Sequence, residues 1–129
     1  MDFDNNRAIY LQIADSICDS ILTGELAPGQ RIPSVREYSA TMAVNVNTVM
    51  RAYEYLSTLR IIYNKRGLGF FTADDAREMV IHVRRAEILG DSIRSTFRQL
   101  MLLGISPSEL SVMYSEYIKY QNQKQEQQK

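Results

Sequence analysis

The 129-residue chain contains one cysteine, one histidine and no tryptophan. A single Cys18 cannot form an internal disulfide, and a single His82 cannot supply a histidine metal cluster. We therefore expect no metal site and no bound cofactor. We interpret Cys18 as a small buried apolar residue.

The chain also lacks a long hydrophobic run. None of its apolar stretches approaches the roughly 18 to 20 residues that span a bilayer. Residues 1–4, Met-Asp-Phe-Asp, are acidic, whereas a signal peptide starts with cationic residues. These absences predict a cytoplasmic protein that does not contact a membrane.

Residues that would carry catalysis are scarce as well. Cys18 and His82 fall on separate predicted helices, and no third residue that would complete a nucleophilic triad can be identified. The sequence has no glycine-rich phosphate loop, because the glycines at 67 and 69 belong to a predicted turn. We therefore predict no catalytic residues and no enzymatic activity.

The formal net charge is zero, although a nucleic-acid-binding domain is usually basic. The charges are, however, unevenly distributed. Residues 31–66 hold six cations and two carboxylates, a net charge of +4, whereas residues 1–30 hold five carboxylates and one arginine. A local basic surface of this kind is sufficient for contacts with phosphates.

Residues 33–56 have the pattern of two helices joined by a tight turn. Ser34 followed by Glu37 is a capping box that predicts a helix start, and Asn45 can cap a second helix from about 46 to 59. So short a connection predicts a steep crossing, as in a helix-turn-helix. The outer face of the second helix carries groups that suit base edges and phosphates, namely Asn45, Asn47, Thr48 and Arg51. A merely solvated helix face is the alternative interpretation.

Two short β-prone runs, at 61–64 and 70–72, follow the second helix. Lys65, Arg66 and Gly67 lie between them and predict a turn with cations at its tip. A helix-turn-helix followed by such a hairpin is typical of a winged helix, whose tip can contact phosphate or a minor groove. A helix over about 8–23, capped by Gly24, completes the predicted unit. The predicted core consists of Ile13, Ile17, Ile21, Ile32, Val35, Met42, Val44, Val49, Leu56, Ile61 and Phe71.

The residues beyond the hairpin have helical patterns. From Met79 the apolar positions alternate by four and three residues, which predicts one long helix of roughly 28 residues that ends at Gly104. Ser106 and Glu109 form a second capping box and predict another helix. Two helices cannot bury all of these apolar residues, so we expect a partner chain, with folding back onto the winged helix as the alternative. The predicted dimerisation residues are Val83, Ala86, Gly90, Ile93, Phe97, Leu100, Met113 and Tyr117.

Several motifs in order resemble the N-terminal domain of GntR-family bacterial transcription regulators. They lie at 10–13, 24–37, 44–49, 52–53 and 67–71, so the resemblance covers residues 8–72 almost without a gap. The short remainder and the Asn-x-Asn-Thr-Val form of the second helix resemble the YtrA subfamily in particular.

The resemblance implies roles for individual residues. Arg36 corresponds to the family's usual DNA-contacting arginine, Thr48 to a phosphate or base contact, and Arg66 to the wing contact. Val46 and Met50 stand where many relatives have arginine. The base contacts that those arginines make in the relatives therefore cannot be assigned to this chain. Arg60 stands where relatives often place a helix-ending glycine.

We therefore predict a mostly α protein, an α+β winged helix-turn-helix with a C-terminal two-helix dimerisation appendage. Residues 1–72 form the DNA-binding domain, 73–121 the helical dimerisation and effector region, and 122–129, which lack apolar side chains, a disordered tail. The candidate DNA-binding residues are Ser34, Arg36, Asn45, Asn47, Thr48, Arg51, Lys65, Arg66 and Gly67.

The predicted function is a sequence-specific transcription regulator, a repressor, that binds a pseudo-palindromic duplex DNA operator as a homodimer. A winged-helix module for protein association or double-stranded RNA is the alternative. The C-terminal region is too small for a private ligand pocket. A small-molecule effector, if one exists, would bind in the dimer groove or at the junction with the winged helix, with a hinge at 72–75.

Overall fold

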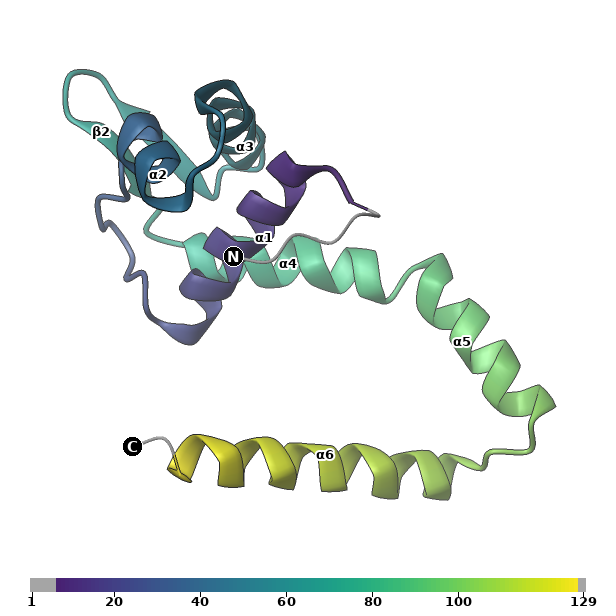
Figure 1. The fold of residues 1–129 in the computed structure, drawn as a ribbon. Helices are drawn as coiled ribbons and strands as arrows, with labels where there is room; N and C mark the ends of the chain where they lie inside the picture. Colours follow the sequence, from purple (N-terminus) through teal and green to yellow (C-terminus); the bar gives the residue numbers. More distant parts are fainter. Residues whose placement is uncertain (1–6, 128–129) are drawn as a thin grey trace. The chain divides into compact units, whose positions relative to one another are not determined.

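The computed structural model describes residues 7–127 of the chain. In this part the chain forms helices and one β-hairpin, as Figure 1 shows. The elements are α1 (Ile9–Thr23), α2 (Val35–Met42), α3 (Val46–Thr58), β1 (Ile62–Lys65), β2 (Gly69–Thr72), α4 (Ala76–Ile88), α5 (Asp91–Leu102) and α6 (Pro107–Gln127). One compact unit ends at Arg85, and a second begins at Ala86. The predicted fold class, mostly α with a winged helix-turn-helix, is confirmed.

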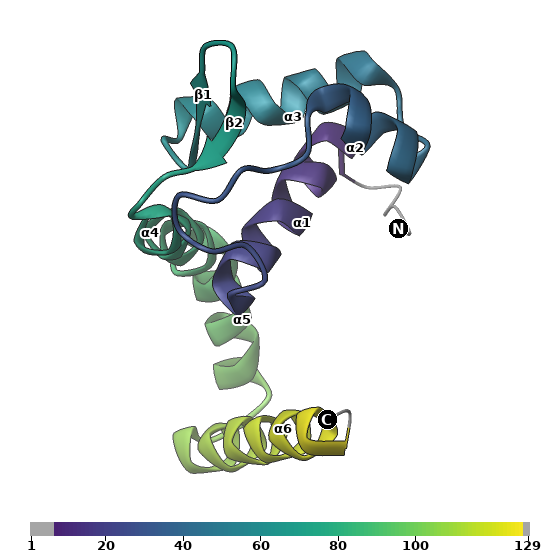
Figure 2. The same ribbon diagram turned by 90° about the vertical axis from the view of Figure 1, so that its left-hand side faces the viewer.

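Local capping signals define the ends of the first three helices. Gly24 ends α1 with a φ of 85°, a left-handed conformation that glycine adopts without steric cost. The Ser34 hydroxyl accepts a hydrogen bond from the Glu37 amide at 3.1 Å and starts α2. The Asn45 side chain accepts one from the Asn47 amide at 2.8 Å and starts α3. Figure 2 shows α2 and α3 joined by a short turn, so the predicted helix-turn-helix is confirmed.

The wing is an antiparallel hairpin in which Ile62 pairs with Thr72 and Lys65 with Gly69. The segment before α2 lies along this hairpin, because the Ile32 amide donates to the Phe70 carbonyl at 2.9 Å. Thr72 is fully buried, and its hydroxyl donates to the Ala27 carbonyl at 2.6 Å and accepts from the Gln30 amide at 3.0 Å. A residue held in this way does not fit the predicted hinge at 72–75.

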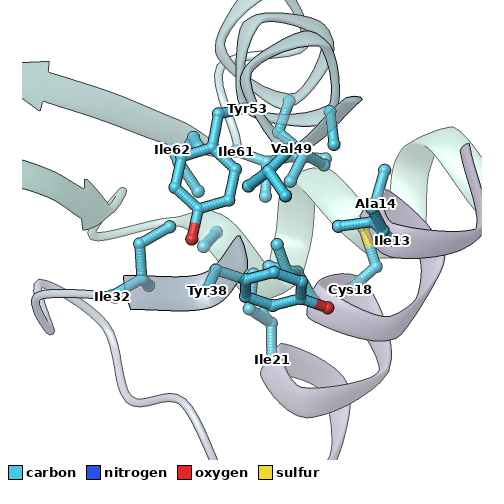
Figure 3. Close-up of a cluster of buried hydrophobic side chains, with 14 of the residues drawn as sticks. Ile13, Ala14, Cys18, Ile21, Ile32, Tyr38, Val49, Tyr53, Ile61 and Ile62 are labelled. Atoms are coloured by element: carbon cyan, nitrogen blue, oxygen red, sulfur yellow. The ribbon is translucent and has the colours of Figure 1, made fainter. Parts of the chain in front are cut away.

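The core of the first unit lies between α1, α2, α3 and the hairpin. Figure 3 shows part of it, with Tyr53 among isoleucines from several elements. Tyr53 is fully buried, and its hydroxyl donates to the Pro33 carbonyl at 2.6 Å. The buried apolar residues are Ile13, Ala14, Ile17, Cys18, Ile21, Ile32, Val35, Tyr38, Val49, Ala52, Tyr53, Leu56, Ile61, Ile62, Ala76 and Val80. The prediction that Cys18 is a buried apolar residue is confirmed.

Three predicted core residues are less buried than expected. Met42 is exposed because it ends α2, next to Ala43 in a left-handed conformation, and Val44 is only partly buried. Phe71 points away from the core because successive side chains of a strand alternate between its faces. Phe70 takes the core side instead, with its ring centroid 5.0 Å from that of Tyr53.

The first half of α4 belongs to the same core. Ala76 and Val80 are buried in it. Arg84 joins α4 to α1, because its guanidinium lies 2.6 Å from the Asp19 carboxylate and donates to the Asp15 carbonyl at 2.9 Å. The contacts of α4 thus extend the winged-helix unit beyond residue 72. The predicted assignment of residues 73–121 to one separate domain stays a prediction.

The prediction of one long helix after the hairpin is wrong. The helix ends at Ile88, and a new one begins at Asp91, with Gly90 between them at φ −86° and ψ −144°. Glycine is a poor helix former, and an acidic residue directly after it is favourable in the first turn of a new helix. The predicted seam is therefore divided, with Val83 and Ala86 on α4 and Ile93, Phe97 and Leu100 on α5.

The prediction of a disordered tail from residue 122 is also wrong for the described residues. The Ser106 hydroxyl accepts from the Glu109 amide at 3.1 Å and starts α6, as the capping box predicted. The helix then continues to Gln127. Glutamine, glutamate and lysine are good helix formers even without an apolar face. Residues 128 and 129 lie outside the described part.

Candidate nucleic-acid interface

The start of α3 carries the polar residues predicted to read DNA. Asn45 is the N-cap, Asn47 is exposed, and Thr48 is partly exposed. The Asn45 carboxamide oxygen accepts from the Asn47 amide, and the amide nitrogen of the same side chain can donate to DNA. The buried residues of α3, including Val49, Ala52 and Leu56, lie on its other face.

Arg51 lies one turn further along α3 and contacts α1. Its guanidinium carbon is 4.1 Å from the centroid of the Tyr10 ring, and Tyr10 in turn packs edge-on against Tyr55. Stacking on an aromatic face orients a guanidinium and leaves its in-plane N–H groups able to donate. Residues Tyr10, Asn47, Thr48 and Arg51 line a depression of about 330 Å³. This contact of Tyr10 with Arg51 was not predicted from the sequence.

The next candidates lie on α2. Arg36 is exposed in its first turn. The Ser34 hydroxyl caps the helix, so the structure shows Ser34 in a structural role. Hydrogen bonding with the Ser34 side chain, and then with Arg31, lowers the pKa of the Glu37 carboxyl.

The tip of the wing carries Lys65, Arg66 and Gly67. Gly67 has a φ of 81°, and the Leu68 amide donates to the Lys65 carbonyl at 2.9 Å, which closes the turn. The Lys65 ammonium lies 4.8 Å from the centroid of the Phe71 ring. Arg66 is exposed at the tip. The predicted cationic hairpin tip is confirmed.

Arg31 connects the wing to α2, a role that was not predicted from the sequence. Its Nε donates to the Leu68 carbonyl at 3.3 Å, and its Nη2 lies 3.3 Å from the Glu37 carboxylate. A Cβ at Gly69, which has a φ of 111°, would lie 3.2 Å from the Arg31 Nε. In the sequence, Arg31 stands out only as one of the six cations of residues 31–66.

These contacts bring exposed cations from α2, α3 and the wing into one compact unit. Within residues 7–127, no cluster of three or more histidine, cysteine or acidic side chains could hold a metal ion. The described helices include none that is long and apolar enough to cross a membrane. A helix-turn-helix with a polar second helix and a cationic wing defines a winged-helix DNA-binding protein.

Comparison with known proteins identifies the family. The model of bacterial regulatory proteins, gntR family, matches residues 9–72. The Bacillus subtilis HTH-type regulator YhcF is 33% identical over 108 residues, which are 84% of this chain and 88% of YhcF. The B. subtilis HTH-type repressor YtrA is 33% identical over 81 residues, which are 63% of this chain and 62% of YtrA.

A solved structure is similar over most of its length. The crystal structure of a GntR-family transcriptional regulator from Bacteroides thetaiotaomicron matches with a TM-score of 0.74 and 53% identity, over 87% of this chain and 98% of that chain. The chain belongs to the GntR family. It is a DNA-binding transcriptional regulator of the helix-turn-helix type, and the family consists of regulators and not of enzymes.

Proposed function

We propose that this protein acts in the cytoplasm as a repressor that binds a pseudo-palindromic operator as a homodimer. The observation that carries the proposal is the uncovered apolar surface of the second unit. Neither α5 nor α6 buries a residue, and Phe97, Met101 and Leu103 are 50%, 72% and 72% exposed. A second copy of the chain can cover such a surface symmetrically.

An apolar groove between these helices also supports a second copy of the chain as the partner. Phe97, Leu100 and Leu110 help to line an apolar groove of about 390 Å³ within the second unit. An isolated groove of this kind would expose apolar area to water, whereas burial between two copies removes it. Of the residues predicted for dimerisation, Ile93, Phe97 and Leu100 lie on α5, and Met113 and Tyr117 lie on α6.

A two-fold dimer presents two copies of α3 to two half-sites of DNA. In this proposal Asn45, Asn47 and Arg51 read base edges, Thr48 contacts a phosphate or base, and the wing contacts phosphates or a minor groove. On α2, Arg36 contributes a further DNA contact. Repression is proposed because the relative YtrA is named as a repressor.

Operator spacing tests this proposal. The operator would first be located by footprinting the DNA upstream of the protein's own gene. Five base pairs would then be inserted between its half-sites, which turns them to opposite faces of the duplex because B-DNA has about 10 to 10.5 base pairs per turn. We expect binding to fall to the level of nonspecific DNA. A duplex with one half-site scrambled serves as the control, and unchanged affinity after the insertion would refute the dimer.

A further inference from the structure

The start of α1 lies beside α3, as Figures 1 and 2 show. Tyr10 stands in the first turn of α1 and is partly buried, and the Arg51 guanidinium carbon lies 4.1 Å from the centroid of its ring. This distance is well within the roughly 6 Å over which a cation is attracted to the face of an aromatic ring. Tyr10 therefore contacts a residue that is proposed to read DNA.

The Tyr10 ring is itself held in place. It packs edge-on against Tyr55 of α3, with 6.1 Å between the two ring centroids. Ile13 and Ala14, which follow on α1, are buried in the core, so this part of α1 cannot shift without disturbing a closely packed interior. The ring is thus a fixed support for the long and flexible side chain of Arg51.

Arg51 differs from three other arginines of the described residues 7–127. Arg7, Arg31 and Arg84 each form an ion pair with a carboxylate. Arg51 has no ion pair in this part of the chain, and its guanidinium contacts the Tyr10 ring instead. A carboxylate occupies the N–H groups of a guanidinium, whereas a ring face orients the group and leaves these donors free. The donors of Arg51 thus remain available to DNA.

Arg51 and Asn47 are neighbours on α3. They are four residues apart, which places both side chains on the same face of the helix, and both are exposed. Together with Tyr10 and Thr48 they line a depression of about 330 Å³. The commonest specific contact of an arginine in the major groove is the bidentate pair with the O6 and N7 acceptors of guanine. The chemistry of Arg51 therefore favours guanine as its base.

We propose that Tyr10 is a positioning residue, which holds the Arg51 guanidinium in the orientation that recognises one guanine in each half-site of the operator. This rests on the proposed function, in which Arg51 reads a base. An arginine that is ordered before binding loses less rotamer freedom when it meets its base. A base without the matching acceptors gains nothing from this order. The ring therefore increases the preference for guanine and leaves nonspecific binding unchanged.

The first measurement uses the full chain without DNA, labelled with ¹⁵N. Nuclear magnetic relaxation at the Arg51 Nε reports how well the guanidinium is ordered. We expect an ordered Nε in the unaltered protein and in Tyr10→Phe, which keeps the ring. In Tyr10→Leu, which removes the ring, the Nε should be mobile. Circular dichroism and urea denaturation check that each variant folds.

The second measurement maps base preference on the operator located by footprinting. Each base pair of a half-site is replaced in turn. Arg51 reads the pair whose replacement weakens binding by the unaltered protein but not by Arg51→Ala. We expect guanine there, preferred by about 5- to 150-fold over other bases. Tyr10→Leu should reduce this preference about two- to tenfold, as loss of order in one arginine implies, and Tyr10→Phe should keep it.

Two further variants separate positioning from a general effect on the fold. Tyr63→Leu makes the same change at an exposed tyrosine of the wing and should keep the guanine preference. In the double variant Tyr10→Leu/Arg51→Ala, the preference should equal that of Arg51→Ala alone, because Tyr10 acts through Arg51.

The proposal is overturned if the Arg51 Nε is equally mobile with and without the ring, or if Tyr10→Leu keeps the full guanine preference. Loss of the preference in Tyr10→Phe, or a further loss in the double variant, would overturn it as well. Failure of the proposed function has a different signature, because the unaltered protein itself would then show no base preference on any duplex. That result would refute the proposed function and this role of Tyr10 together.

Discussion

Arg60 occupies a backbone conformation that favours glycine. Its φ is 61°, and it follows α3 in a Schellman motif, in which the Ile61 amide donates to the Leu56 carbonyl at 3.1 Å. A left-handed conformation costs a residue with a Cβ about 1 to 2 kcal/mol. A glycine at this position, as the sequence comparison with the family led us to expect, would therefore have a physical basis, and Arg60 departs from that pattern at a cost in strain.

Arg60→Gly should raise the free energy of unfolding by about 0.5 to 1 kcal/mol, because the relief of strain exceeds the entropy that glycine adds to the unfolded chain. Urea denaturation measures the change. Arg60→Lys keeps the strained conformation and should be neutral. Equal stability of the glycine variant and the lysine control would show that the strain is negligible.

Thr72 links the wing to the segment before α2. Thr72→Val has the same shape but removes the two hydrogen bonds of the hydroxyl, to the Ala27 carbonyl at 2.6 Å and from the Gln30 amide at 3.0 Å. The Gln30 amide keeps its bond to the Ala27 carbonyl at 3.2 Å. We expect a loss of about 0.5 to 1.5 kcal/mol in the free energy of unfolding, the usual net contribution of a hydrogen bond. Thr72→Ser restores the hydroxyl and should recover most of it. A valine variant as stable as the serine variant would contradict this role.

Individual DNA contacts are separable by substitution. Arg36→Ala and Arg66→Ala should weaken operator and nonspecific binding alike and leave folding intact, because both side chains are exposed. Asn47→Ala should instead relax sequence preference, since a bidentate contact with adenine is worth about 1 to 3 kcal/mol of discrimination. Competition binding against operator and random duplex measures both effects. Arg98→Ala on α5 is the control, and wild-type binding by all three variants would show that the DNA-binding face is misplaced.

At the scale of elements, α2 and α3 are coupled through buried tyrosines. The ring centroids of Tyr38 and Tyr53 are 6.3 Å apart in an edge-on arrangement. Burial raises the pKa of both hydroxyls, and for Tyr53 the charges of Tyr38 and Glu37 add to the effect. Packing of the two helices thus depends on both rings remaining neutral.

The raised pKa values predict a loss of stability in alkali. An unfolded tyrosine loses its proton at a pH of about 10, while the folded protein retains it to higher pH. The stabilising contribution is therefore complete below pH 10 and is lost as pH rises through the folded pKa values. The free energy of unfolding should fall between pH 10 and 12, as urea denaturation would show.

The double variant Tyr38→Phe/Tyr53→Phe should have a smaller alkaline loss, although it starts from a lower stability because the bond to Pro33 is absent. Tyr63→Phe, an exposed tyrosine, should keep the slope of the unaltered protein. An identical slope in the double variant would assign the alkaline loss to other groups.

For the whole molecule, the exposed apolar residues of the second unit determine the oligomeric state that we expect, a homodimer. Phe97→Asp and Ile93→Asp each place a charge on α5, and burial of an unpaired charge in an interface is strongly unfavourable. We expect monomers that lose tight operator binding while the winged helix stays folded. Sedimentation and operator binding measure the two properties, and circular dichroism checks the fold.

Ser95→Asp is the control for charge on the same helix, since Ser95 is exposed and lies outside the predicted seam. It should remain dimeric. A Phe97→Asp variant that stayed dimeric, or a monomer that still bound operator tightly, would mean that the C-terminal helices do not determine the spacing of the two DNA-binding units.

The helix starts and the hairpin could be predicted because their causes are local. Ser34 and Asn45 cap helices through amides two or three residues away, and Gly24 and Gly67 supply left-handed turns. The predicted helix through Gly90 and the predicted disorder of the tail were wrong for a related reason. Apolar periodicity continues through Gly90 and stops before the tail, whereas helix propensity disfavours glycine inside a helix and permits a polar helix at the C-terminus.

The sequence by itself determined the winged helix-turn-helix, its cationic wing and the family, because local signals and ordered motifs are sufficient for these. Only the tertiary structure decided that Phe70 and not Phe71 enters the core and that Tyr10 supports Arg51. The tertiary structure also decided that the Arg31 guanidinium donates a hydrogen bond to the carbonyl of Leu68, 37 positions away in the sequence. Such contacts depend on how distant segments pack, and packing is a property of the folded chain as a whole.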